Sequence, residues 1–137
     1  MKIGILGAGS WGGALALAAA DAGHDVTLWS YNNIFDDFHG RDIPANVRPT
    51  DQLADLRDMD LWMGVVPAAF FRETLVTAAP HYGHQPLLIC TKGIEPGTHR
   101  FMAEIVADVL PDCRDVAVLS GPQFAAEVAR RVPTSST

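Results

Sequence analysis

Three glycines near the start of the chain have the spacing of a phosphate-binding loop. Gly7, Gly9 and Gly12 form a Gly-x-Gly-x-x-Gly pattern directly after the apolar residues 2–6 and before an alanine-rich stretch. The first glycine permits a tight turn, the second lets a pyrophosphate approach the backbone, and the third lets a helix pack closely on a sheet. Free N–H groups and the positive end of a helix dipole then face the ligand. The spacing predicts a dinucleotide-binding loop; the alternative is a glycine-rich turn that binds nothing.

The residues after the second apolar run decide which dinucleotide is favoured. Ser30 and Tyr31 follow residues 25–29, at a position where a carboxylate would accept a hydrogen bond from a ribose 2′-hydroxyl and favour NAD. That position has no carboxylate and no adjacent arginine for a 2′-phosphate. The sequence is therefore compatible with NADP or NAD, and it leans to NADP because no negative charge repels the phosphate. The alternative is that this loop contacts no ligand.

Lys92 is the charged residue best placed for a further contact. It follows the apolar run at residues 86–91 and precedes Gly93. A lysine there would meet a phosphate or the carboxamide end of the cofactor, and the alternative is a solvated surface lysine. Trp11 lies within the glycine loop, where it would shield the cofactor. None of the five histidines has metal-ligand spacing with another histidine, a cysteine or an aspartate, so no metal site is predicted.

Strands and helices alternate along the whole chain. Strands are predicted at 2–6, 25–29, 47–49, 60–66, 86–91 and 115–119, and helices at 10–22, 51–57, 68–78, 98–110 and 123–131, with one helical turn at 34–38. Such alternation is typical of an α/β fold with a doubly wound parallel sheet, here Rossmann-like with strand order 3-2-1-4-5-6. Ser10 is the expected N-cap of the first helix, and Pro49 confines its strand to a sheet edge. Residues 1–137 are thus expected to form one dinucleotide-binding domain.

The composition excludes several classes of partner. The net charge is −6 and no basic run occurs, which argues against nucleic acid and against an anionic membrane surface. The apolar segments are too short to span a bilayer, and no secretory signal precedes the first strand. Cys90 and Cys113 are predicted to be free thiols. These features favour a cytoplasmic location.

Five segments, taken together, resemble one known family. They are residues 7–16, 23–29, 65–67, 91–95, and 119–125 with 127–129. In this order they are similar to landmarks of NAD(P)-dependent glycerol-3-phosphate dehydrogenase, and they extend over the N-terminal cofactor-binding domain of that family. The resemblance implies a reversible reduction of dihydroxyacetone phosphate to sn-glycerol 3-phosphate, in the cytoplasm, with a nicotinamide cofactor.

The resemblance also implies roles for individual residues. Ser10 and Trp11 would contact the cofactor phosphates, Tyr31 would lie near the adenosine ribose, and Ala125 would contact the cofactor. Lys92 would contact both cofactor and substrate. The substrate side would include Gly121 and Gln123, although the family usually has Ser or Thr where Gln123 stands.

The family's helical C-terminal domain, which carries its catalytic lysine, is absent from these 137 residues. No catalytic residue is therefore assigned, and the chain by itself is expected to be inactive. Two alternatives stay open: a related NAD(P)-dependent dehydrogenase with another substrate, or a non-catalytic nucleotide-binding module. Residues 115–119 form the last predicted strand, and its apolar run at 116–119 has no charges or prolines to guard a sheet edge, so self-association is expected there.

Overall fold

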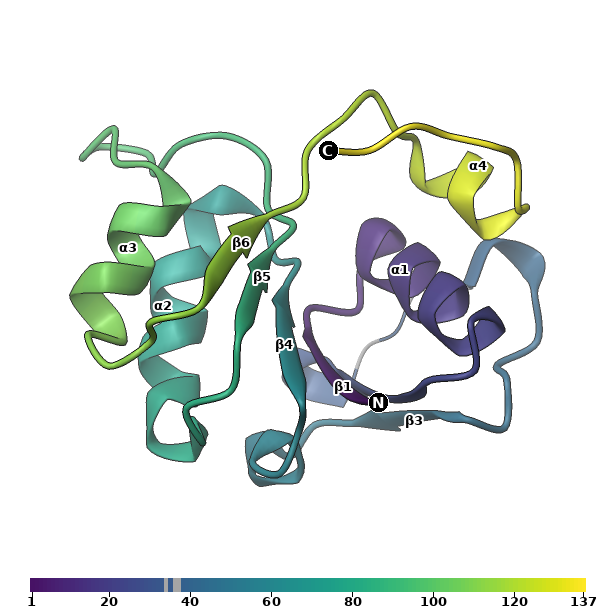
Figure 1. The fold of residues 1–137 in the computed structure, drawn as a ribbon, viewed down its shortest axis with the longest axis horizontal. Helices are drawn as coiled ribbons and strands as arrows, with labels where there is room; N and C mark the ends of the chain where they lie inside the picture. Colours follow the sequence, from purple (N-terminus) through teal and green to yellow (C-terminus); the bar gives the residue numbers. More distant parts are fainter. Residues whose placement is uncertain (34, 36–37) are drawn as a thin grey trace.

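The apolar runs of the chain form one parallel sheet (Figure 1). The computed structural model describes residues 1–33, 35 and 38–137. The strands are β1 Lys2–Leu6, β2 Asp25–Trp29, β3 Val47–Thr50, β4 Leu61–Gly64, β5 Leu87–Ile89 and β6 Val116–Val118. They are ordered β3-β2-β1-β4-β5-β6, and every neighbouring pair is parallel. The predicted α/β fold class and strand order are confirmed.

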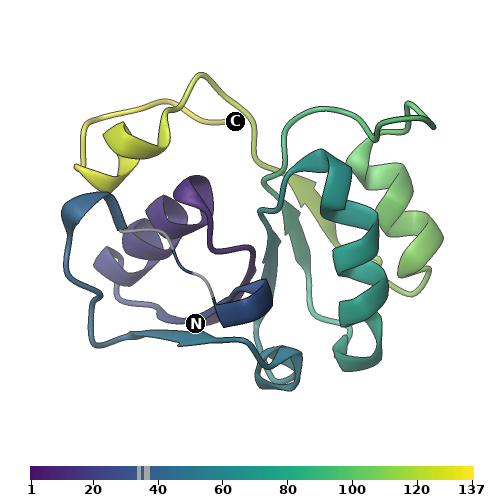
Figure 2. The same ribbon diagram turned by 180° about the vertical axis from the view of Figure 1, so that it is seen from behind.

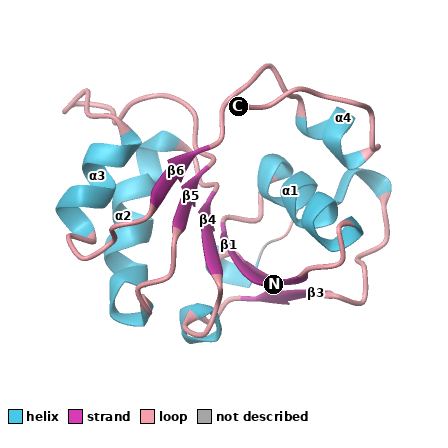
Figure 3. Ribbon diagram, in the orientation of Figure 1, coloured by secondary structure: helices cyan, strands magenta, loops and turns pink. Residues whose placement is uncertain are grey.

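Helices cover both faces of this sheet (Figures 1 and 2). They are α1 Ser10–Asp21, α2 Ala68–Ala78, α3 Met102–Val109 and α4 Ala125–Ala129. The helix α1 lies on one face with α4 packed against it, whereas α2 and α3 cover the other face, as the colouring by secondary structure also shows (Figure 3). Because strand side chains alternate between faces, Ile5 and Leu28 join the apolar cluster under α1, while Leu6 and Trp29 join the cluster under α2.

Several predicted boundaries move because tertiary contacts decide them. Residues 51–57 were expected to be helical, but they contain only the 3₁₀ turn Leu53–Leu56. The helix expected at 98–110 begins at Met102, since residues before it form a small hairpin with an antiparallel bridge between Ile94 and Phe101. The edge position of β3, which carries Pro49, is confirmed. The single turn expected at 34–38 falls largely outside the described residues.

The start of α1 differs from the prediction by one residue. Gly9, not Ser10, occupies the N-cap position, with an extended backbone (φ −72°, ψ −174°) and no side-chain hydrogen bond to the helix. The first helical bond runs from the Gly13 N–H to the Gly9 carbonyl, at 2.8 Å. The expectation that Ser10 caps the helix is therefore wrong, because the loop brings a residue without a side chain to that position. At the far end, Gly23 follows the C-cap residue Ala22 with a left-handed backbone (φ +85°), which is a common way for a helix to end.

Gly12 sets the distance between α1 and β1. A Cβ atom at this position would fall on the carbonyl oxygen of Gly7, which belongs to the turn out of β1. The adjacent Gly13 has room, since a Cβ atom there would lie 3.8 Å from Phe38, an ordinary contact distance. Both glycines are buried within the same helix, so they differ mainly in how closely the strand approaches.

We expect Gly12→Ala to lower the free energy of unfolding by about 2 kcal/mol, because one methyl group forces the helix off the strand. Denaturant unfolding of the purified chain measures this. Gly13→Ala is the matched control and should unfold at the same or a higher denaturant concentration, because alanine favours the helix. Equal stability of the two variants would contradict the close approach.

Candidate functional site

The glycine loop leaves the N-terminus of α1 open. Gly7 has φ +116°, a conformation that other residues rarely adopt, and its N–H donates to the Trp29 carbonyl at 3.0 Å. A Cβ atom built on Gly9 would meet nothing within 4 Å. Gly9 therefore borders empty space in front of helical N–H groups that have no side-chain cap. An anion such as a pyrophosphate fits these groups, since they supply hydrogen-bond donors and a positive dipole end.

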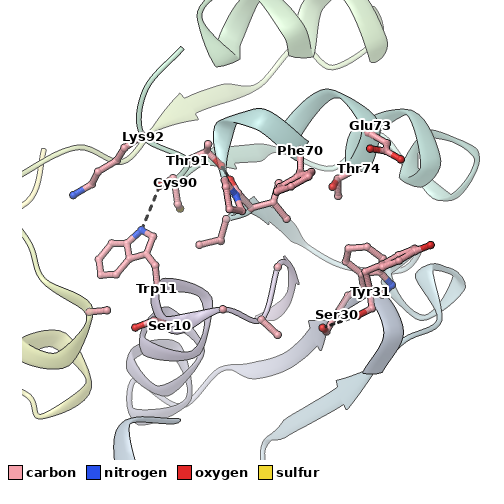
Figure 4. Close-up of a pocket in the computed structure, with 18 of the residues that line it drawn as sticks. Ser10, Trp11, Ser30, Tyr31, Phe70, Glu73, Thr74, Cys90, Thr91 and Lys92 are labelled. Carbon is pink, nitrogen blue, oxygen red and sulfur yellow. Dashed lines mark hydrogen bonds between the residues drawn. The ribbon is translucent and has the colours of Figure 1, made fainter. Parts of the chain in front are cut away.

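A cavity of about 780 Å³ opens in front of this loop (Figure 4). Such a volume is within the usual range for small-molecule and cofactor sites. Its walls come from the carboxyl ends of β1, β2, β4 and β5, from α2, and from the start of α4. In an open parallel sheet, this is the switch point at which ligands bind, because the chain leaves β1 and β4 toward opposite faces.

The cavity brings together most of the residues that the sequence singled out. Those that line it are Gly7, Gly9, Ser10, Trp11, Tyr31, Lys92, Gln123 and Ala125. Gly12 and Gly121 do not line it. Gly12 acts behind the loop, as described above. Gly121 (φ +148°) is held against the last residues of the chain, where a Cβ atom would lie 2.7 Å from the Ser135 carbonyl oxygen.

Lys92 has a fixed position at one end of the cavity. Its ammonium group donates to the Gly121 carbonyl at 3.0 Å and lies 5.5 Å from the centre of the Trp11 ring. The Trp11 indole N–H in turn donates to the Cys90 carbonyl at 3.3 Å (Figure 4). Lys92 is therefore exposed but oriented, and Trp11 connects the phosphate loop with the end of β5.

Gln123 and Cys90 line the cavity near Lys92 and differ in the chemistry that they offer. The amide oxygen of Gln123 is buried and has no hydrogen-bond partner among the residues that the structure describes. A buried acceptor without a donor is costly, so a ligand that carries an N–H or O–H group would be stabilised here. Cys90 also lines the cavity, but burial raises the pKa of its thiol to about 12, so it is no nucleophile near neutral pH.

The opposite end of the cavity includes residues that sequence reasoning missed. Phe70, Glu73, Thr74 and Thr77 line it from α2, facing Tyr31 (Figure 4). Their spacing places them on one helix face, and that regularity was the available signal. Trp29 of β2 is buried, yet it also borders the cavity.

Across residues 1–33, 35 and 38–137, no three histidine, cysteine, aspartate or glutamate side chains are grouped so that they could hold a metal ion. Within the same described ranges, no helix combines the length and the apolar character needed to cross a bilayer.

Comparison with known proteins agrees with this geometry. Residues 2–137 match the family model described as NAD-dependent glycerol-3-phosphate dehydrogenase N-terminus. The chain belongs to this family. The family resemblance inferred from the sequence motifs is thereby confirmed.

Individual relatives show how much of the protein family the chain represents. A glycerol-3-phosphate dehydrogenase [NAD(P)+] of Rhodopseudomonas palustris is 42% identical over 149 residues, which cover 99% of this chain and 44% of the relative. A crystal structure of glycerol-3-phosphate dehydrogenase from Coxiella burnetii superposes with a TM-score of 0.84 at 34% identity, over 98% of this chain and 45% of that one. The enzyme of Saccharomyces cerevisiae shares the fold, with a TM-score of 0.77 at 20% identity over 95% of this chain and 44% of that one. The chain thus spans less than half the length of these proteins.

An ion-pair network fixes the segment that follows Lys92. Arg72 of α2 bonds both carboxylate oxygens of Glu95, at 2.6 and 3.0 Å, and it also reaches Asp108 of α3 at 3.3 Å. Thr98 donates a further hydrogen bond to Glu95, and Arg100 pairs with Asp108. The hydrogen bonds from Arg72 and then Thr98 lower the pKa of Glu95 from 4.5 to about 2. The network therefore ties α2, the hairpin and α3 together.

The depressed pKa makes a pH-dependent contribution to stability. Because Glu95 binds protons more weakly in the folded chain, its contribution is fully present above about pH 4.5 and disappears as the pH falls toward 2. We expect the unfolding temperature of the unmodified chain to exceed that of Glu95→Gln near neutral pH. The difference should shrink between about pH 4.5 and pH 2. Thermal melts of both proteins across this range measure it, and a gap that stays constant down to about pH 2 would contradict the ion-pair argument.

Proposed function

We propose that residues 1–137 are a dinucleotide-binding domain and that the cavity binds NAD or NADP. The observation that carries this proposal is the continuity of the cavity with the uncapped N-terminus of α1, at which Gly9 leaves room for a pyrophosphate. Ser10 and Trp11 flank this point, and Tyr31 borders the cavity beyond it. Membership of the glycerol-3-phosphate dehydrogenase family supports the same ligand.

We propose that the site slightly favours NADP over NAD. No carboxylate follows β2 directly, which supports the lean to NADP. A carboxylate does reach the cavity, but it comes from Glu73 on α2. The adenosine ribose, with the 2′-phosphate in NADP, would therefore meet neutral side chains at Ser30 and Tyr31.

We further propose that the whole protein interconverts dihydroxyacetone phosphate and sn-glycerol 3-phosphate in the cytoplasm. The cofactor would supply the hydride. Lys92 and Gln123 stand at the same end of the cavity, where Lys92 offers a positive charge and Gln123 offers an amide oxygen without a hydrogen-bond partner in the described part of the chain. The positive charge suits the phosphate of a small phosphorylated substrate, and the amide oxygen suits a hydroxyl group of that substrate. Gly121 would position Lys92, and Ala125 would contact the cofactor. Residues 1–137 include no proposed proton donor, so turnover by this segment alone is not expected.

A substitution in the loop tests cofactor binding. Gly9→Val places a branched side chain in the space that a pyrophosphate needs, and the extended backbone at this position accepts valine without strain. We expect the affinity for both NADH and NADPH to fall by more than about tenfold, equivalent to about 1.4 kcal/mol. Calorimetric titration of the purified chain measures both affinities.

Gly13→Ala is the control for this experiment, because it changes a buried glycine of the same helix that does not line the cavity. It should bind both cofactors as the unmodified chain does. Unchanged affinity in Gly9→Val, with a folded protein, would mean that the cofactor does not lie on the loop.

A second proposal concerns association of the 137-residue chain with itself. The strand β6 lies at the end of the sheet, and all three of its residues are exposed. Val118 is 54% exposed, and Phe124 nearby along the chain is 70% exposed. An apolar edge strand without charges or proline is a ready template for another strand. We propose that two copies pair through β6.

Light scattering coupled to size-exclusion chromatography tests this pairing over a range of concentrations. We expect the measured mass of the unmodified chain to rise with concentration. The mass of Val118→Lys should stay at the value of a monomer, because a charge on an edge strand disfavours pairing. Val76→Lys is the matched control, because Val76 is equally exposed, at 55%, but lies on α2. A monomer at all concentrations in the unmodified chain, or loss of association in both variants, would refute pairing through β6.

A further inference from the structure

We propose that Glu73 selects the base of the dinucleotide, by accepting a hydrogen bond from the exocyclic amine of adenine. The inference rests on the proposed cofactor site, and it assigns a specificity-determining role to a residue outside every sequence motif described above. It follows from the direction of the ligand, the shape of the cavity wall and the chemistry of α2.

The glycine loop fixes the direction of the ligand. With the pyrophosphate at Gly9, the two halves of a dinucleotide must extend in opposite directions along the cavity. Lys92 and Trp11 stand on one side of the loop, and Tyr31 and Glu73 stand on the other (Figure 4). The adenosine half extends toward the end of β2, because the ribose of such ligands lies there. The base must then occupy the space between β2 and α2.

Two aromatic side chains border that space. Tyr31 is 73% exposed and Phe70 is 58% exposed, which is unusual for large apolar rings on one concave surface. They come from the two opposite walls, since Tyr31 follows β2 and Phe70 lies in the first turn of α2 (Figure 4). A planar base entering between these walls would cover apolar ring surface and leave its polar edge pointing farther along α2.

Glu73, Thr74 and Thr77 line this part of the cavity. The polar edge of the base would therefore meet these three residues. Within the described part of the chain, the Glu73 carboxylate forms no ion pair and accepts no side-chain hydrogen bond, whereas the adjacent Arg72 is fully engaged with Glu95 and Asp108 on another side of α2. The Thr77 hydroxyl donates to the Glu73 backbone carbonyl at 2.9 Å and leaves the carboxylate available.

The chemistry of this edge discriminates between purines. An ionised carboxylate can only accept hydrogen bonds, so a carboxylate that faces the 6-substituent of the purine suits the amino group of adenine and repels the carbonyl group of hypoxanthine. A glutamine at the same position would accept through its carbonyl or donate through its amide and would therefore suit both bases. Glu73 thus discriminates between the two bases, whereas a glutamine at this position would not.

The test compares NADH with its hypoxanthine analogue, reduced nicotinamide hypoxanthine dinucleotide, by calorimetric titration. We expect the unmodified chain to bind NADH about tenfold more tightly, because a hydrogen bond to a charged group is lost and a repulsion is added in the analogue. In Glu73→Ala and in Glu73→Gln the two ligands should bind within about twofold of each other. Glu73→Gln should also bind the analogue more tightly than the unmodified chain does.

Controls separate this inference from the proposed function. Asp112→Asn removes one negative charge from an exposed turn away from the cavity and should change neither affinity. If the unmodified chain binds neither ligand, the cofactor site itself is wrong. If it binds both but Glu73→Ala keeps the preference for NADH, the base filter is wrong. If Glu73→Ala changes only the ratio of the NADPH affinity to the NADH affinity, the inference is also wrong, because the carboxylate would then face the ribose 2′ position.

Discussion

The contact between the start of α1 and the turn after β1 is the constraint on which the other features of the site depend. The helix approaches so closely that Gly12 cannot carry a Cβ atom, and this approach aims the N-terminus of α1 at the carboxyl end of the sheet. A larger residue would push the helix outward and turn its free N–H groups away from the cavity. The N-cap residue has no side chain to occupy those groups. The helix α1 therefore lacks the usual side-chain cap, and its first backbone N–H groups can donate to a ligand.

Much of the fold follows from local patterns in the sequence. The apolar runs of β1, β2, β4 and β5 are buried on both faces, which is why they are recognisable as central parallel strands. Pro49 indicates an edge strand because it cannot donate to a ladder, and β3 is indeed at the edge. The glycine at the end of α1 has the left-handed backbone that its residue type suggests. In each case one residue type has one dominant physical consequence.

The remaining parts of the site depend on contacts between distant segments, which no local pattern reports. The hairpin that precedes α3 is held through Glu95, which accepts a hydrogen bond from Arg72 of α2, 23 residues earlier. Trp11 meets the backbone of Cys90, 79 residues away. The wall formed by α2 was missed because its stripe of Phe70, Thr74 and Thr77 has no special composition. Its meaning becomes clear only when the strand order places it opposite the end of β2.

The helix α2 connects the two ends of the cavity mechanically. One of its faces lines the end near Tyr31, while Arg72 on another face is bonded to Glu95, three residues after Lys92. The same helix is packed on the sheet through Phe71 and Leu75, both fully buried. A shift of α2 would therefore have to move the far wall of the cavity and strain the ion pairs beside Lys92 at the same time. Because packed interiors resist gradual deformation, these anchors hold the separation between the aromatic end and the lysine end fixed. A dinucleotide bound across the glycine loop would therefore enter a cavity whose length is fixed before the ligand binds.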